Sequence, residues 1–263
     1  MAKFSSLFSS SSGNSTYLSC SSGSLLVDAG VSFRKISAAL RGLGTEPDEN
    51  EAVLLTHEHI DHIRGLRAFV KNTGAAVYAT ASVLEYLTAH DHVPPQARLF
   101  PVDGRPFAVA GMEVRAFRTP HDSVGSVGYR FHTPDDHQIA VATDIGRVTE
   151  EVRRGIEGCE LVMIESNYDE AMLRNGPYPY YLKARIRSGD GHLSNPDCAE
   201  EVARLAQCGS ARFVLAHLSR ENNRPEIAGG QIEQRLTSLG LRPGIDYELI
   251  VSGPEGIGRL IRI

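Results

Sequence analysis

One short segment of the sequence concentrates side chains that bind metal ions. It reads Thr56-His57-Glu58-His59-Ile60-Asp61-His62 and directly follows a run of apolar residues. Because residues i and i+2 of an extended segment point to the same side, His57 and His59 can reach one ion. Asp61 and His62 then open a helix and can turn toward a second ion. Imidazole and carboxylate are ligands that suit zinc or manganese, and a pair of such ions can activate water. The spacing therefore predicts a metal centre.

Short apolar runs alternate with helical patterns along most of the chain and would position this centre. Nine runs are typical of strands: Leu25–Val27, Ala52–Leu55, Ala76–Tyr78, Val114–Phe117, Gly128–Phe131, Ile139–Ala142, Leu161–Ile164, Phe213–Ala216 and Leu260–Ile263. Six segments are typical of helices: Phe33–Leu43, His62–Asn72, Ser82–Ala89, Thr149–Gly155, Asp197–Ala206 and Pro225–Leu239. No shift in composition indicates a linker. The alternation predicts a single mixed α/β domain over residues 1–263.

Composition and charge exclude several classes of protein. The 263 residues are 41% hydrophobic and 22% charged, which is enough to bury a core and is not typical of disorder. The net charge of −5 argues against a basic surface that coats nucleic acid, although a local basic patch is compatible with it. No apolar run is long enough to span a membrane, and no P-loop or G-x-G-x-x-G motif predicts a nucleotide cofactor. Four scattered cysteines and the absence of a signal-like start predict reduced thiols in the cytoplasm.

The H-x-H-x-D-H motif is the signature of the metallo-β-lactamase superfamily, and the segments Leu26–Gly30, Thr119–Ser123, Ala142–Gly146 and Leu215–Ser219 resemble it further. The resemblance implies a four-layer αββα sandwich, with two mixed sheets face to face and the site on loops at one edge. It also implies seven metal ligands: His57, His59 and His121 for the first ion, Asp61, His62 and His217 for the second, and Asp144 as the bridge.

Asp28 is expected behind these ligands. Its position at the end of an early strand resembles the superfamily's aspartate and predicts that it orients a metal-binding imidazole or the loop around it. The alternative is that Asp28 only forms the turn before Gly30.

Smaller motifs narrow the resemblance. The segments Ser9–Asn14, Glu165–Asp169, Gly191–Asn195 and His217–Asn223 together resemble the YycJ (WalJ) family of bacterial hydrolases. That family is associated with 5′-to-3′ exonuclease activity on duplex DNA and with mismatch repair, which implies DNA as the partner and two divalent ions as cofactors. The alternatives are hydrolysis of a small phosphodiester, thioester or lactone, and a catalytically silent metal-binding scaffold. No feature of the sequence specifies an oligomeric state.

His192 and Asp61 are the predicted catalytic residues. The position of His192, 25 residues before His217, is similar to that of a ribonuclease Z-type histidine near the scissile phosphate. This predicts a proton donor to the leaving oxygen or a phosphate contact, and the alternative is a loop histidine that caps the next helix. Ribonuclease Z-type enzymes carry a glutamate three residues before the bridging aspartate. Because Val141 stands there, His192 is expected to lack that partner, while Asp61 orients the attacking water.

Two further segments are candidates for binding the substrate. The serine cluster that ends at Gly13-Asn14 can present hydroxyl and backbone N–H groups to a phosphate, so Ser12 and Asn14 are candidates, and a surface turn is the alternative. On a helix that begins at Pro179, Lys183 and Arg187 share a face among several tyrosines. This predicts a groove that follows a phosphate backbone, although an ordinary amphipathic helix explains the pattern equally well.

Overall fold

The structure is a computed structural model that describes all 263 residues, and its strands form two seven-stranded sheets. In spatial order the first sheet contains β14 (Ile261–Arg262), β1 (Lys3–Phe8), β2 (Ser15–Ser19), β3 (Ser24–Val27), β4 (Asn50–Leu54), β5 (Ala76–Ala79) and β6 (Leu99–Pro101). The second contains β13 (Glu248–Val251), β12 (Arg212–Ala216), β11 (Leu161–Glu165), β10 (Gln138–Ala142), β9 (Val127–His132), β8 (Met112–Arg118) and β7 (Phe107–Val109).

The two sheets pack face to face through one face of each strand. Successive side chains of a strand point to opposite faces, so Ile139 and Val141 of β10 enter the core between the sheets, while Ala140 and Ala142 face the helices. Both faces of β10 are therefore buried. A strand buried on both faces is a continuous apolar run, which is why these strands could be predicted.

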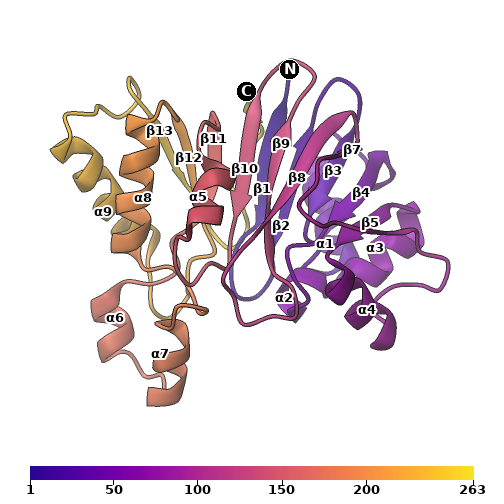
Figure 1. Ribbon diagram of the computed structural model, residues 1–263, viewed down its shortest axis with the longest axis horizontal. Helices are drawn as coiled ribbons and strands as arrows, with labels where there is room; N and C mark the ends of the chain where they lie inside the picture. Colours follow the sequence, from indigo (N-terminus) through magenta and orange to yellow (C-terminus); the bar gives the residue numbers. More distant parts are fainter.

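Helices cover the outer face of each sheet (Figure 1). Those beside the first sheet are α1 (Phe33–Gly42), α3 (Leu66–Thr73) and α4 (Ala81–Ala89), with the short α2 (Ile60–Ile63) at its edge and the 3-10 turn η1 (Pro47–Glu49) before β4. Those on the second are α5 (Glu150–Ile156), α8 (Asn195–Gln207) and α9 (Pro225–Ser238). Two more, α6 (Glu170–Asn175) and α7 (Tyr180–Ile186), project away from the sheets. These layers confirm the predicted αββα sandwich.

The elements predicted from periodicity are present, with one difference. The helix expected over His62–Asn72 is divided into α2 and α3 at Gly65. There the backbone turns so that the Gly65 N–H donates to the carbonyl oxygen of Ala29, and a Cβ on Gly65 would lie 1.9 Å from the carbonyl oxygen of Val31. The division is therefore imposed by a close approach between two distant segments.

Two further observations concern membrane-spanning helices and the state of the cysteines. None of its helices combines the length and apolar character that crossing a bilayer requires. All four cysteines are free thiols: Cys159 and Cys198 are buried, Cys20 is half-buried and Cys208 is exposed.

Candidate metal centre

The predicted metal ligands converge on one edge of the sandwich because they follow the ends of strands. In the first sheet, the loop after β4 carries the motif at 57–62. In the second sheet, His121 follows β8, Asp144 follows β10 and His217 follows β12. β10, β11 and β12 are parallel, so their carboxyl ends meet at the same edge. The site therefore joins loops from both sheets.

Three of the strands that lead to the site end in a left-handed residue. Asp28, Asp144 and His217 have φ values of 62°, 55° and 55°. A non-glycine residue in this region is uncommon and costs on the order of 1–2 kcal/mol, and such residues are concentrated at functional sites. Each of these residues follows its strand within two positions, and the turn there brings its side chain toward the cluster.

The first group of possible donors consists of His57, His59 and His121, whose ring nitrogens lie within 4.8 Å of one another. Nδ1 of His59 is 3.3 Å from Nε2 of His121, and Nε2 of His57 is buried without a hydrogen-bond partner. Burial lowers the pKa of His57 well below its ordinary value and also lowers that of His121. A neutral imidazole keeps a lone pair, so the rings of His57 and His121 are prepared to bind a cation.

The second group consists of Asp61, His62 and His217. Oδ2 of Asp61 lies 3.6 Å from Nε2 of His62 and 3.6 Å from Nε2 of His217. Nδ1 of His62 donates to Asp28 over 2.8 Å, and Asp28 also accepts from the backbone N–H of Thr56. A carboxylate behind the ring fixes its orientation and leaves Nε2 to face the cluster. Asp28 thus lies on the side of the His62 ring opposite Nε2.

Asp144 lies between the two groups. Its Oδ2 is 3.3 Å from Nε2 of His62, and its Oδ1 is 3.7 Å from Nε2 of His121. Burial would raise the pKa of this carboxyl, but the neighbouring His217 and His62 outweigh burial and hold the pKa well below its usual range. Asp144 is therefore an anion in contact with both groups.

The cluster fits divalent cations on the evidence of its unpaired atoms. Nε2 of His57, Nε2 of His217 and Oδ2 of Asp144 are buried and have no hydrogen-bond partner. A buried polar atom without a partner costs about 1–3 kcal/mol, so three in one cluster favour a bound cation that contacts all of them. Two sets of three imidazole and carboxylate donors around one carboxylate suit two ions of the zinc or manganese type.

Glu165, at the end of β11, is a site residue for which the sequence analysis assigned no role. Its Oε1 accepts hydrogen bonds from Nδ1 of His192 and Nδ1 of His217, each over 2.8 Å. Its Oε2 accepts the backbone N–H groups of Ile145 and Leu193. Burial would raise the pKa of Glu165, but the two histidines, His192 foremost, lower it. The carboxylate is therefore charged and fully hydrogen-bonded.

The expectation that His192 lacks a carboxylate partner is wrong. Val141 does stand in β10, where its side chain enters the core between the sheets, but Glu165 supplies the partner from the next strand. In the parallel register Ile164 lies opposite Ala142, so Glu165 reaches the same level as the loop of Asp144. A charged residue that ends an apolar strand was the available signal. The helix that follows His192 is capped by Ser194, whose hydroxyl accepts the N–H of Asp197.

The candidate substrate residues have different surroundings. Asn14 is buried, and its amide nitrogen lies 3.4 Å from Oδ2 of Asp61 and 3.1 Å from Nε2 of His62. Ser12 is half-buried in the same loop, and its carbonyl oxygen accepts from Arg64. Asn14 thus contacts two members of the donor cluster, while Ser12 lies nearer the surface. Lys183 lies on α7 and Arg187 directly follows that helix, and both are outside the donor cluster.

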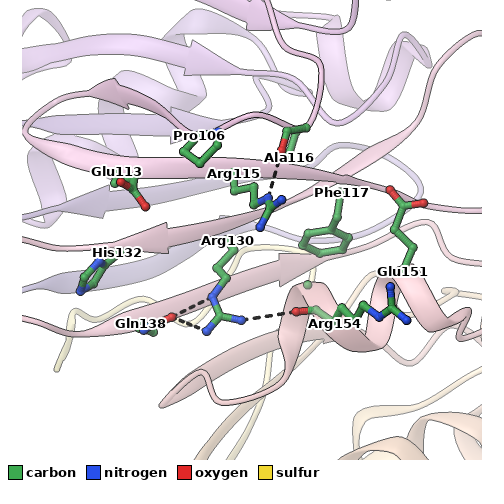
Figure 2. A pocket seen from close by; sticks show the side chains of 12 residues that line it. Pro106, Glu113, Arg115, Ala116, Phe117, Arg130, His132, Gln138, Glu151 and Arg154 are labelled. Atoms are coloured by element: carbon green, nitrogen blue, oxygen red, sulfur yellow. Dashed lines mark hydrogen bonds between the residues drawn. The ribbon is translucent and has the colours of Figure 1, made fainter.

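A separate hollow of about 420 Å³ lies on the outer face of the second sheet, between β8, β9 and α5 (Figure 2). Its arginines are engaged within the chain: the Arg130 guanidinium donates to Gln138 and to the carbonyl oxygens of Arg154 and Glu157. Glu113 and Glu151 also line the hollow and offset part of its positive charge. None of its lining residues belongs to the donor cluster, so this hollow is not the centre of the chemistry.

Comparison with known proteins agrees with this geometry. Residues 24–218 match the model of the beta-lactamase superfamily domain, and the chain belongs to this superfamily of metal-dependent hydrolases. It is 35% identical over 257 residues to exodeoxyribonuclease WalJ of Streptococcus pneumoniae serotype 2 (strain D39 / NCTC 7466), covering 96% of this chain and 95% of the relative. It is 33% identical over 255 residues to exodeoxyribonuclease YycJ of Bacillus anthracis, covering 96% of each. Within the superfamily it is a member of the YycJ/WalJ family.

The fold is shared more widely than the sequence. Zn²⁺-bound PqqB from Methylobacterium extorquens superposes over 100% of both chains with a TM-score of 0.75 at 19% identity. At this identity the likeness concerns the fold alone.

Proposed function

We propose that this chain is a DNA exonuclease that uses two divalent ions, zinc or manganese, to degrade duplex DNA from 5′ to 3′ in DNA repair. The observation that carries the proposal is the arrangement of two three-donor groups around Asp144, with the His192–Glu165 pair beside them. Such a centre suits phosphodiester hydrolysis. DNA as the substrate is supported by the family, whose two relatives named above are exodeoxyribonucleases.

In this proposal the seven donors are divided between two ions, as follows: His57, His59 and His121 for the first, Asp61, His62 and His217 for the second, and Asp144 for both. Two bound ions would polarise the phosphoryl oxygens and lower the pKa of water. Asp28 and Glu165 would keep the rings of His62 and His217 in position through their Nδ1 atoms.

Asp61 and His192 would orient the attacking water and protonate the leaving oxygen, respectively. Both side chains are partly open to solvent, at 17% and 14% exposure, whereas Asp144 and His217 are almost fully buried. The Asp61 carboxylate can accept a hydrogen bond from the attacking water and orient it. Glu165 holds Nδ1 of His192, so Nε2 is free to donate a proton to the leaving oxygen.

We also propose that residues 1–263 form one domain located in the cytoplasm. Pairing of β14 with β1 brings residues from both ends of the chain into one sheet, which supports a single folding unit. Four free thiols without a disulfide are typical of a reducing compartment.

The test is digestion of duplex DNA labelled at either the 5′ or the 3′ end, with Mn²⁺ or Zn²⁺ and with Asp144→Asn as the inactive control. Degradation from 5′ to 3′ releases a 5′ label at once as a small product, whereas a 3′ label stays on progressively shorter strands. The opposite pattern contradicts the polarity. Hydrolysis of bis-p-nitrophenyl phosphate, a thioester or a lactone without any attack on DNA would instead identify a small-ester hydrolase.

A further inference from the structure

A second hollow lies between α6 and α7, the two helices that project from the sheets. It has a volume of about 530 Å³ and is lined by Leu173, Arg174, Tyr180, Lys183, Ala184 and Arg187. The volume is within the range of pockets that hold small ligands, roughly 300–1,000 Å³. Four of the lining residues are spaced i, i+3, i+4 and i+7, from the first residue of α7 to the residue that follows its end, so one face of that helix forms a wall of the hollow.

Lys183 builds this hollow and is not free to bind a ligand. Its ammonium group donates to the carbonyl oxygens of Arg174 and Gly176 over 2.9 and 2.7 Å. These bonds tie α7 to the end of α6. Leu173 and Ile186 form a small separate core below them, together with Tyr168. The pair of helices is therefore a packed unit. The sequence predicted that Lys183 contacts a phosphate, but its ammonium group instead holds α7 against the end of α6.

The two arginines of the hollow, in contrast, have no partner. The guanidinium groups of Arg174 and Arg187 take part in no hydrogen bond or ion pair within the protein. Both side chains are exposed, so a ligand can reach them. No acidic residue lines the hollow. In a chain of net charge −5, two unpaired guanidinium groups at one hollow are complementary to an anion, and guanidinium geometry matches phosphate.

Tyr180 adds an aromatic surface that the fold does not use. The residue is 87% exposed and belongs to no aromatic pair of the protein, so its ring contributes little to the core. An exposed ring beside unpaired arginines is the combination by which proteins hold unpaired nucleotides, because the base stacks on the ring while the backbone contacts the cations. A base pair inside a duplex does not offer its face in this way.

The hollow lies close to the metal centre. The N–H of His192 donates to the carbonyl oxygen of Ile186, the last residue of α7. Arg185 on the same helix forms an ion pair with Asp122, next to His121. Tyr180 precedes Ile186 by six residues, or about 9 Å along the helix, which is the length of two to three nucleotides of one strand at about 3.4 Å each.

From these observations, and on the basis of the nuclease activity proposed above, we infer that the hollow between α6 and α7 binds an unpaired nucleotide at the end of the DNA substrate. The base stacks on Tyr180, and the adjoining phosphate lies between Arg174 and Arg187. The α6–α7 unit thus distinguishes DNA ends that carry a single-stranded overhang from blunt ends.

The experiment measures binding of the metal-loaded protein to fluorescein-labelled duplexes with phosphorothioate linkages that resist cleavage. The duplexes are blunt or carry a short 5′ or 3′ overhang. The wild type is expected to bind one overhang more tightly than the blunt end, and Tyr180→Ala to lose this preference with a roughly fivefold or greater loss of affinity. Tyr180→Phe keeps the ring and should keep the preference. Tyr181→Ala is the matched control, because Tyr181 is 75% exposed on the same helix but does not line the hollow.

The contribution of the two arginines is tested by measuring how the affinity for DNA depends on salt concentration. Arg174→Ala and Arg187→Ala should each reduce the slope of log affinity against log salt for the overhanging duplex by about 0.7. Arg34→Ala, which removes an exposed and unpaired arginine from α1, should leave the slope unchanged.

Equal binding of blunt and overhanging duplexes by the wild type would overturn the inference, as would equal effects of Tyr180→Ala and Tyr181→Ala. In either case digestion of end-labelled duplex would show that the nuclease proposal still stands. A protein that neither binds nor digests DNA would contradict both.

Discussion

Glu165 and His192 form a carboxylate–imidazole pair, with Oε1 of Glu165 2.8 Å from Nδ1 of His192. The same oxygen lies 2.8 Å from Nδ1 of His217. One buried carboxylate therefore orients two rings, one at a predicted metal ligand and one at the predicted proton donor. Both rings therefore depend on the same anion for their orientation.

His192→Ala is expected to lower turnover of DNA by roughly a hundredfold to ten-thousandfold while substrate affinity changes little, because a proton donor acts in the transition state. Glu165 holds the ring of His192 in the orientation that this proton transfer needs. A diester with a p-nitrophenolate leaving group needs less protonation and should lose less. The measurement is steady-state turnover of both substrates.

Metal content separates this role of His192 from a structural one. His192→Ala should retain the metal content of the wild type. Loss of an ion from the variant, or equal losses on both substrates, would show that His192 is not the proton donor.

The wild type is expected to bind two divalent ions per chain, and His59→Ala about one, because His59 belongs to only one of the two donor groups. Elemental analysis after dialysis against Mn²⁺ or Zn²⁺ provides the count. Asp144→Asn should weaken both sites, since its carboxylate faces both groups. A single ion in the wild type at saturating metal, unaffected by Asp144→Asn, would rule out the paired site.

Gly30→Ala is expected to destabilise the protein by about 3 kcal/mol and to weaken metal binding. A Cβ on Gly30 would lie 1.7 Å from the carbonyl oxygen of Asp61, so the loop of Asp28 and the helix of Asp61 would have to separate. Urea unfolding measures the change. Gly42→Ala is the matched control: it meets no atom within 4 Å and should stabilise α1 by up to about 1 kcal/mol. Equal urea midpoints of unfolding for Gly30→Ala and Gly42→Ala would contradict the close approach at Gly30.

Stability should fall as the pH rises from about 9 to about 11. Burial raises the pKa of the Cys159 thiol from 9.0 to about 11, raises that of Cys198 further, and raises that of Tyr168 to about 12. In this window the unfolded chain has released protons that the folded chain still holds, so the free energy of unfolding decreases with pH. Two pKa units at Cys159 correspond to about 2–3 kcal/mol.

Urea midpoints across that pH range test this expectation, and Cys159→Ala should show a shallower decline than the wild type. Unchanged wild-type midpoints would mean that these groups ionise as readily in the folded chain as in the unfolded one.

The central strands could be predicted from the sequence because they are buried on both faces, and the donor motif because its spacing is local. The arrangement of these strands in a sandwich was implied by the resemblance to the superfamily. β1 and β2 were missed since their buried positions include serines such as Ser5, Ser6 and Ser15, which do not form an apolar run. The partner of His192 was missed for a different reason. Glu165 reaches it through the register of β10 against β11, and such a register is a property of the assembled sheet.

The pairing of β1 with β14 has a practical consequence for handling the molecule. Lys3 lies opposite Arg262, and β1 then runs toward Ser9, whose hydroxyl oxygen accepts the N–H of His217. Six residues of strand span about 20 Å, so both ends of the chain lie at the margin of the sandwich opposite the reactive loops, as Figure 1 shows for the ends relative to α2. A fluorescent fusion or a surface tether attached at either end would therefore leave the reactive loops accessible, which permits single-molecule recording of a strand as it is digested.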